Sequence, residues 1–358
     1  MYYISVWDRR ISNISVIMKK LLILLLSATL FVGCGGNKSS QHEVSETSIN
    51  DNGADQIGRS VDTPKTNTLP EGSLPGIFTV GHSKKIHFSK GNLQYKPSKN
   101  IWRFAKNQYD IIGNANEAIS PDYDGFIDLF SWGTSGWKSS ETSMGPADIQ
   151  SNDATNNWGF GPWGDLEGDD EDDNVNGDWG VFNAIKGGGE KPGLWRTLSY
   201  QEWKYLLLKR PRAARLLALG DIGGVTGLFI LPDDYDDDDF HSLAQEEYNV
   251  YADGYANEYR SYSSWNSKNR SEWETYQNKG VVFLPAAGFR GRTVMYSVGE
   301  SGLYWTASAT SKEWDPMRNN AFRLSFGGSY LTIKTEDKSN GYSVRLVQDA
   351  PCEVEDDD

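Results

Sequence analysis

The C-terminal part of the chain alternates apolar and polar residues, and this pattern restricts the fold more than any other feature of the sequence. Phe322, Leu324 and Phe326 are separated by single polar residues, and the stretch 342–346 shows the same pattern. A period of two is typical of a β-strand whose two faces differ in exposure. We therefore expect antiparallel, half-buried strands here.

Further strand signals occur throughout the chain. Residues 85–89 and 101–105 alternate in the same way, and the apolar runs 225–232 and 281–285 both end in proline. Short apolar or alternating segments between turn residues are typical of strands. With few helical patterns beside them, they predict an α+β fold with a twisted antiparallel sheet, few short helices and long ordered loops.

One short helix is marked unusually clearly. Ser199 and Glu202 have the spacing of a capping box, in which each side chain binds a free backbone N–H group at the start of a helix. Leu198 and Trp203 have the spacing of a hydrophobic staple, and Pro211 ends the segment. We expect a packing helix from 200 to 210, with a second short helix over 213–219.

The stretch from 110 to 193 is rich in glycine, aspartate, asparagine and tryptophan. Glycine permits tight turns, and a tryptophan ring can hold an irregular loop against a core. We expect long ordered loops in this part of the chain.

The N-terminal residues indicate export. From Met18 to Cys34 the sequence has two lysines, a short apolar run and a small residue before the cysteine. This pattern is typical of a secretion signal, and it resembles a bacterial lipoprotein signal in which that cysteine receives the lipid. We expect residues 1–33 to be the signal peptide, with Met18 as the true start, and Cys34 to be the lipidation site.

The rest of the chain divides by composition. Residues 34–75 are polar and small, which predicts a flexible tether; 76–348 form the folded domain, and 349–358 an acidic tail. Of the two cysteines, Cys34 is used by the lipid and Cys352 lies in the tail. The domain therefore has to be stabilised by its core, without a disulfide.

The charge of the chain limits its partners. The formal net charge is −14, and a strongly acidic surface repels both nucleic acid and anionic lipid. We therefore expect no nucleic acid partner, and membrane contact through the lipid anchor only. The 13 tryptophans and 18 tyrosines also exceed what a core of ordinary size requires, and such rings form sugar-stacking and protein-binding surfaces.

The motifs resemble a known family. WRTLSYQEWKYLL (195–207) and NGYSVRLV (340–347) are similar to segments of formylglycine-generating-enzyme-like (sulfatase-modifying factor) proteins. The ordered set GNLQY, WRFA, DLFSWGTSGW, DWGVFNAI, WRTLSYQEW, GLFILPDDY, VFLPAAGFR, GLYWTASA and NGYSVRLV resembles the Fibrobacter-type major paralogous domain of Bacteroidetes lipoproteins. The resemblance spans 76–347 and implies a C-type-lectin-like domain.

The sequence gives little support for a catalytic function. The resemblance implies an active-site cysteine pair that holds copper, and residues 76–348 contain no cysteine. The histidines form no recognisable catalytic arrangement with serine or cysteine. We expect no catalytic residue, and we expect His87 to be a surface residue of a strand. The four histidines are His42, His82, His87 and His241.

Two acidic segments are candidates for calcium. The start of the first matches a D-x-N-x-N-G loop, whose oxygen atoms suit Ca²⁺, although its twelfth position is Asn183 in place of the usual glutamate. The second is 232–240. The alternative in both cases is a solvated acidic loop. The candidate ligands of the first are Asp172, Asn174, Asn176 and Asp178.

The last candidate is a recognition surface. The resemblance implies a ligand face built late in the chain, and among related domains some are diversified by retroelements there. This segment holds an aromatic and polar mixture that suits adaptable binding, whereas Trp305 is expected in the core. The alternative is an ordinary solvated loop. The candidate contacts are Trp314, Asp315, Arg318, Asn319, Asn320 and Tyr330.

Together these features predict a lipid-anchored cell-envelope protein, held at the outer membrane by Cys34, whose domain binds a protein or glycan ligand through its C-terminal loops without catalysis. Two alternatives stay open: an envelope hydrolase that uses loop carboxylates, and a structural or assembly lipoprotein. The segment after Cys34 lacks an obvious acidic export tag, and both the surface-exposed and the periplasmic orientation are considered.

Overall fold

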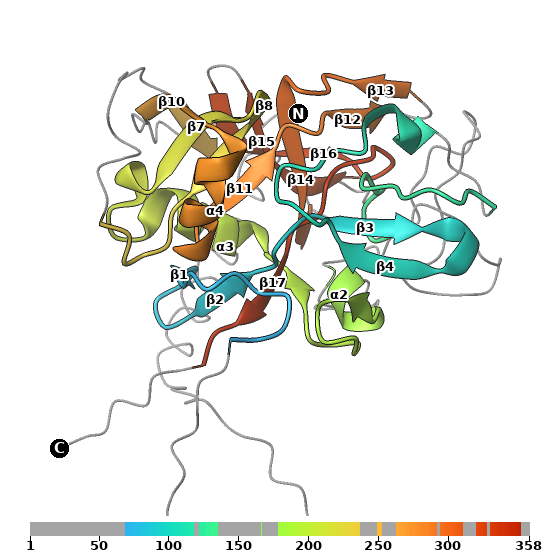
Figure 1. Cartoon of the computed structure of the whole chain (residues 1–358), viewed down its shortest axis with the longest axis horizontal. Helices are drawn as coiled ribbons and strands as arrows, with labels where there is room; N and C mark the ends of the chain where they lie inside the picture. The colour runs from blue at the N-terminus through green and yellow to red at the C-terminus, as the bar shows by residue number, and fades with distance from the viewer. Residues whose placement is uncertain are drawn as a thin grey trace, which may run out of the picture. The chain divides into compact units, whose positions relative to one another are not determined.

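The computed structural model describes residues 69–117, 122–134, 166, 178–236, 249–252, 263–291, 294–310, 320–327 and 330–351. These residues all belong to one compact unit, Thr66–Asp358. The expected signal peptide, Cys34 and most of the expected tether lie outside them. The unit is α+β, built mostly from small sheets with a few short helices (Figure 1).

The sheets bring together strands that are far apart in the sequence. Among the described residues, the first sheet has the order β1 (Phe78–Thr79), β2 (Lys85–Phe88), β17 (Leu346–Asp349), β6 (Arg196–Thr197). The second has the order β10 (Ser263–Lys268), β7 (Leu217–Ile222), β8 (Val225–Ile230), β11 (Val282–Pro285). The third has the order β14 (Ser301–Ala309), β15 (Asn320–Gly327), β16 (Tyr330–Asp337), β9 (Asn249–Ala252).

Two smaller sheets complete the described part: β3 (Leu93–Lys96), β4 (Ile101–Phe104) and β5 (Ile185–Lys186) in one, and β12 (Phe289–Gly291) and β13 (Val294–Tyr296) in the other. The pairs β10/β7, β16/β9 and β4/β5 are parallel. The expectation of a single antiparallel sheet is therefore wrong, because the long connections let distant strands pair in either direction.

The described helices are short. They are α2 (Trp179–Phe182), α3 (Tyr200–Lys204) and α4 (Arg270–Asn278), with 3₁₀ turns η1 (Pro97–Lys99), η2 (Gly113–Glu117) and η4 (Ala213–Arg215), and a π-helical segment η3 (Tyr205–Lys209). Within the described ranges, none of these helices has the length and hydropathy needed to cross a bilayer.

The capped helix forms as the sequence predicts. The Ser199 side chain accepts a hydrogen bond from the Glu202 N–H, and Glu202 accepts one from the Ser199 N–H. The helix continues through η3 to Arg210, whose extended backbone precedes Pro211. Leu198 and Trp203 are both buried in the same core cluster. The helix is therefore a packing element, as expected.

The second expected helix is mostly a strand. Only Ala213–Arg215 is helical, as a single 3₁₀ turn, and β7 begins two residues later at Leu217. The run of leucines and alanines has helical propensity, but β7 lies between β10 and β8 in the sheet. Its inter-strand hydrogen bonds override the local preference.

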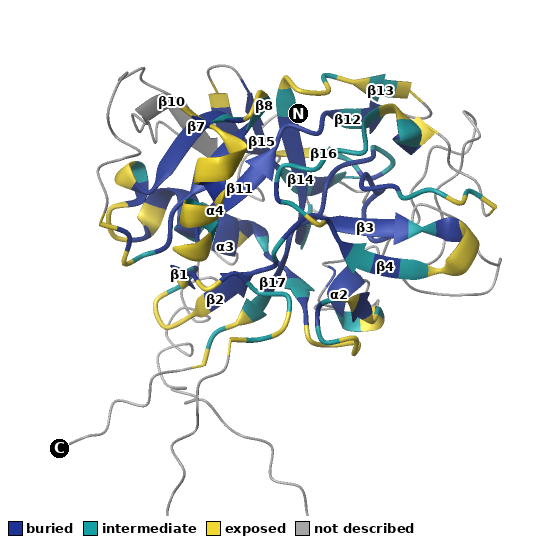
Figure 2. Ribbon diagram, in the orientation of Figure 1, coloured by how far each residue is buried: buried dark blue, intermediate teal, exposed yellow. Residues whose placement is uncertain are grey.

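The two late stretches are more buried than expected, and only the first is a strand throughout, because β17 begins at Leu346. On β15, Leu324 and Phe326 belong to one core cluster, while Ala321 belongs to a second. In the stretch 342–346, the polar Ser343 and Arg345 are as buried as the apolar residues beside them. Figure 2 shows β14 as buried. The expectation of half-buried strands is wrong, because further segments pack on the polar face.

Tryptophan rings hold irregular segments to the second core cluster, as the sequence suggests. The indole N–H groups of Trp132, Trp179 and Trp305 donate to the backbone carbonyls of Thr306, Thr134 and Phe130, at 2.8, 2.5 and 2.7 Å. Each ring is fully buried. Because the N–H of each ring finds a backbone acceptor, burying these large rings leaves that donor satisfied.

The folded part extends beyond the expected boundaries at both ends. Leu74, expected in the tether, is buried, and its N–H donates to the Phe88 carbonyl. Asp349 and Ala350, expected in the tail, bond to the first sheet through Ile86 and Lys85. These short stretches are polar in composition, but their hydrogen bonds to strands of the first sheet make them part of the folded domain.

His87 is also placed differently from the expectation. It lies on β2 with 6% of its surface exposed, and its Nδ1 is 2.9 Å from the Gly76 carbonyl oxygen. The first sheet is covered on this side, so the polar position of the alternating pattern is buried here. His87 is a structural residue bound to the backbone of the preceding segment.

Candidate functional site

The candidate recognition segment connects two strands whose ends are fixed. β14 ends at Ala309 and β15 begins at Asn320, so residues 310–319 form their connection. The Asn320 carbonyl accepts hydrogen bonds from the Thr310 N–H at 3.1 Å and from the Thr310 hydroxyl at 2.9 Å. Of the predicted contacts, Asn320 lies at this base, while Trp314, Asp315, Arg318 and Asn319 lie outside the described residues.

The end of β14 next to this base is irregular. Trp305 pairs with Arg323 and Ala309 pairs with Ala321, so β14 has two more residues than β15 over this interval. Strand irregularities of this kind redirect side chains and break the ladder. At this point the Ser308 N–H bonds to the Thr306 hydroxyl at 3.1 Å, which turns the chain toward α3.

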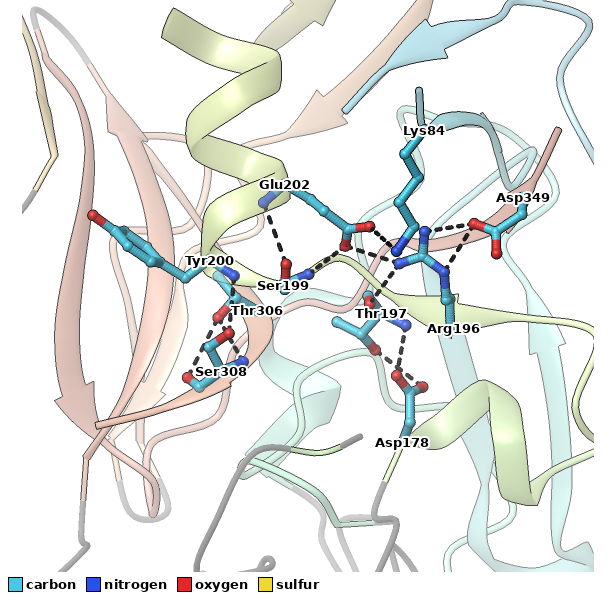
Figure 3. A network of polar contacts seen from close by, with 10 residues as sticks. All are labelled: Lys84, Asp178, Arg196, Thr197, Ser199, Tyr200, Glu202, Thr306, Ser308 and Asp349. Carbon is cyan, nitrogen blue, oxygen red and sulfur yellow. Dashed lines mark hydrogen bonds and ion pairs between the residues drawn. The ribbon is translucent and has the colours of Figure 1, made fainter. Parts of the chain in front are cut away.

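The start of α3 binds this irregular segment directly (Figure 3). The Tyr200 N–H donates to the Ser308 hydroxyl at 3.0 Å, and the Ala307 N–H donates to the Leu198 carbonyl at 2.8 Å. The Tyr200 ring stacks on Phe322 of β15, with a centroid distance of 4.3 Å and an interplanar angle of 25°. The capped helix therefore fixes both strands next to residues 311–319.

A charged network holds the helix start in turn. Glu202 contacts Arg196 at 2.8 Å and Lys84 at 2.7 Å, and Arg196 also contacts Asp349 at 2.6 Å (Figure 3). Burial by itself raises the pKa of Glu202, but Arg196, Lys84 and the Ser199 N–H outweigh it, so the pKa lies below its usual range. The ionised form of Glu202 therefore joins α3 to the first sheet.

Asp178, one of the predicted calcium ligands, caps a helix. Its carboxylate accepts hydrogen bonds from the Gly180 N–H at 3.0 Å, the Thr197 N–H at 2.7 Å and the Thr197 hydroxyl at 3.2 Å, and it is fully buried. Both of its oxygen atoms therefore bind protein donors. Asp172, Asn174 and Asn176 lie outside the described residues, and no cluster of three or more metal-binding side chains occurs in the described part.

The second acidic segment is described only as far as Asp236. Asp233 accepts hydrogen bonds from Thr79 and pairs with Arg210 at 3.1 Å. Asp236 is highly exposed and lies 3.6 Å from Arg212. Asp233 and Asp236 therefore have basic or backbone neighbours, and residues 237–240 lie outside the described ranges.

The structure places Tyr330 and Asn320 at opposite ends of the same hairpin. In the pairing of β15 with β16, Asn320 lies opposite Asp337, and Gly327 lies opposite Tyr330. The eight-residue length of β15 separates these two ends by roughly 23 Å at the usual rise. Trp314, Asp315, Arg318 and Asn319 lie outside the described residues, so the association of Tyr330 with them stays a prediction.

Several residues with marked chemistry were not found from the sequence. Arg345 is fully buried and donates to the side-chain oxygens of Gln108 at 2.6 Å and Asn92 at 3.3 Å. Burial lowers the pKa of Arg345 to about 9. Its position in an alternating strand predicts exposure, so the local sequence offers no signal for this burial.

Asp128 is a second buried charge that the sequence does not reveal. Its carboxylate accepts hydrogen bonds from Asn116 at 2.9 Å and from the Ile112 N–H at 3.1 Å. Burial raises its pKa to about 6, and the neighbouring Asp110 acts in the same direction. This carboxylate fixes the turn η2 to the segment 127–129.

The comparisons with known proteins give one match. Residues 261–347 match the model of a domain of unknown function, DUF8237. No curated protein matches the chain. No solved structure matches it either. The matched residues run from β10 into β17, so they include both ends of the sheet formed by β14, β15 and β16.

Proposed function

We propose that this protein is a lipid-anchored cell-envelope protein whose C-type-lectin-like domain binds a protein or glycan ligand through residues 311–320, without catalysis. The lipid is attached at Cys34 and holds the domain at the outer membrane. The motifs quoted above also support a relation to the Fibrobacter-type major paralogous domain of Bacteroidetes lipoproteins.

The fixed base of the segment is the observation that carries this proposal. β14 and β15 contribute to the core from both faces, Thr310 closes the base on Asn320, and Tyr200 binds Ser308 and stacks on Phe322. Binding loops commonly lie on a rigid scaffold of this kind. A fixed base reduces the conformational entropy that such a loop loses when a ligand binds.

The chemistry of the segment supports the same function. Trp314 and Arg318 belong to the residue types that most often dominate binding energy, and Asp315, Asn319 and Asn320 add hydrogen-bonding groups. In contrast, the described buried acids Asp128, Asp178 and Glu202 all accept hydrogen bonds that stabilise the fold.

The test uses the mature chain with Cys34→Ser, which removes the lipid and leaves the domain intact. This protein is applied to a glycan array and used in affinity capture from envelope extracts, in parallel with Trp314→Ala. Phe182→Ala is the control, since Phe182 is an exposed ring on α2. Ligand retention that is lost with Trp314→Ala and kept with Phe182→Ala supports the proposal; equal retention by all three proteins contradicts it.

The anchor and the calcium ligands are tested separately. Labelling cells with a fatty-acid analogue should mark the protein, Cys34→Ser should remove the label, and Cys352→Ser should keep it.

A rise in melting temperature at millimolar calcium, absent in Asp172→Ala, would support a calcium site at Asp172, Asn174 and Asn176. Hydrolysis of an envelope polymer by the purified protein would favour the enzyme alternative.

A further inference from the structure

The sheet formed by β3, β4 and β5 has one face in the core and one polar face. Arg103 of β4 is the register partner of Gln94 on β3 and of Lys186 on β5, and Lys96 is the partner of Ile101. Register partners on neighbouring strands lie on the same face of a sheet. This polar face therefore carries three cations and no acid. The opposite face carries Leu93, Tyr95, Trp102, Phe104 and Ile185, which belong to the second core cluster.

Arg103 is held in place at the centre of the polar face. Its Nε donates to the side-chain oxygen of Gln94 at 3.0 Å, and its Cζ lies 3.4 Å from the centroid of the Phe126 ring. Gln94 is itself buried, with 2% of its surface exposed. A guanidinium that stacks on a ring keeps its in-plane N–H groups free for other acceptors. In the described part of the chain, its Nη1 and Nη2 have no hydrogen-bond acceptor.

The three cations of the polar face are not neutralised equally. Lys96 pairs with Asp124 at 2.8 Å, whereas Arg103 and Lys186 form no ion pair with any described residue. Burial lowers the pKa of Arg103, although the charge of Asp110 acts in the opposite direction. Arg103 and Lys186 lie directly opposite each other, and like charges in this position destabilise a sheet. An anion between them would remove this repulsion.

The acids near the polar face have other partners or are exposed. Asp110 accepts hydrogen bonds from Asn107, and Asp128 accepts one from Asn116. None of the acids in the flanking segments forms an ion pair with Arg103. The charged residues of the described flanking segments 97–100, 105–112, 122–128 and 187–193 are Lys99, Lys106, Asp110, Asp122, Asp124, Asp128, Glu190 and Lys191.

The geometry of the polar face selects a small carboxylate. The parallel N–H groups of a guanidinium match the two oxygen atoms of a carboxylate. The face is three strands wide, roughly 10 Å at the usual strand spacing, whereas a stable protein interface covers roughly 800 Å² on each partner. The formal charge of −14 also repels polyanions at long range. A single acidic sugar meets these conditions in size, charge and polarity.

We infer that the polar face binds the carboxylate of an acidic sugar. The two carboxylate oxygens accept from Nη1 and Nη2 of Arg103, and Lys186 is the second cation. Gln94 and Phe126 position Arg103, so binding requires little reordering. This inference goes beyond the proposed function, because the site lies on a different sheet from residues 311–320 and does not depend on them.

The experiment is isothermal titration calorimetry of the mature Cys34→Ser chain with galacturonate at low salt. Galactose, which lacks the carboxylate, and acetate, which lacks the sugar ring, are the matched ligands. Arg103→Lys keeps the charge but cannot form two parallel bonds, so it should weaken binding about tenfold. Lys186→Ala should weaken it about threefold, because an exposed cation contributes less. Lys191→Ala, at an exposed lysine of the neighbouring loop, is the control.

The outcomes are distinct. Galacturonate binding that is weakened by Arg103→Lys and Lys186→Ala, and kept in Lys191→Ala and Trp314→Ala, supports the inference. Equal weakening by Lys186→Ala and Lys191→Ala overturns it, since only the net charge would matter. Equal binding of acetate or of galactose overturns the recognition of an acidic sugar. If Arg103→Lys lowers the melting temperature without ligand, the comparison of Lys186→Ala with Lys191→Ala decides.

The same titrations separate this inference from the proposed function. Galacturonate binding that is lost in Trp314→Ala and kept in Arg103→Lys overturns the inference and assigns the sugar to residues 311–320. No binding of galacturonate, or binding of phosphate or of a glutamate-rich peptide in its place, also overturns the inference and leaves the proposed function standing.

Discussion

The two ends of the sheet formed by β14, β15 and β16 differ in how they are held. At the end next to residues 311–319, Lys84 and Arg196 pair with Glu202 of α3, and the Tyr200 N–H donates to Ser308 of β14. At the opposite end, on and beside the β12–β13 hairpin and at the start of β16, two tyrosines and two valines are exposed: Val294, Tyr296, Val298 and Tyr330. The polar contacts at the first end stabilise the fold, whereas the large apolar side chains at the second end are exposed to solvent.

The two ends also differ in how pH changes their contribution to stability. Neighbouring cations hold the pKa of Glu202 below its usual range, so its contribution to stability is present above that range and is lost as the pH falls. Asp128, which fixes the turn η2 behind β13, has a pKa raised to about 6. Its folded form holds the proton more tightly than the unfolded chain, so stability falls as the pH rises toward 6.

The largest expected effect is at the helix cap. Glu202→Ala removes the partner of Arg196 and Lys84 and the acceptor of the Ser199 N–H, and it should lower the free energy of unfolding by roughly 3 kcal/mol. Urea denaturation at neutral pH measures it. Lys84→Ala, which removes only a half-exposed partner, should cost less than about 1 kcal/mol. Equal losses for the two variants would contradict the central role of Glu202.

The next effect concerns Asp128 and the pH. The pKa rises from 3.8 in an unfolded chain to about 6 in the fold. The unfolding free energy of the wild type should therefore fall, relative to Asp128→Asn, by roughly 2 kcal/mol between about pH 4 and pH 6. Asp128→Asn also loses the hydrogen bond from the Ile112 N–H, and this loss changes the free energy of unfolding of the variant by the same amount at every pH. Parallel stability curves for the two proteins would disprove the raised pKa.

A smaller effect is expected where the helix meets the strand. Ser308→Ala removes the acceptor of the Tyr200 N–H and should lower the free energy of unfolding by about 1 kcal/mol. Ser308→Thr keeps the hydroxyl and serves as the control in the same urea titration. If both variants match the wild type, the contact between α3 and β14 does not stabilise the base of residues 311–319.

The smallest effect is expected at Tyr330, at the start of β16. Tyr330→Phe removes one exposed hydrogen bond to Ser301 and should change the free energy of unfolding by less than about 0.5 kcal/mol. The melting temperature, compared with that of Ser301→Ala, measures it. A loss above 1.5 kcal/mol would show that Tyr330 is part of the stabilising core and would remove the contrast between the two ends.

Local patterns predicted the elements that depend on neighbouring residues. The capping box of Ser199 and Glu202, the strand around Phe322 and Leu324, and the buried Trp305 are all confirmed. The stretch 213–219 was predicted wrongly, since its helical propensity is weaker than the inter-strand bonds of β7. Of the candidate contacts, Asn320 lies at the base of the late segment and Tyr330 at the other end of the hairpin, while the remaining four lie outside the described residues.

The sequence by itself determined the α+β class, the capped helix and the positions of most late strands, because helix caps and period-two alternation are properties of residues close together in the chain. The tertiary structure decided which strands pair and which polar residues are buried. Register between distant strands placed Tyr330 beside Ser301, and packing on a second face buried Arg345. Both depend on contacts between residues far apart in the sequence.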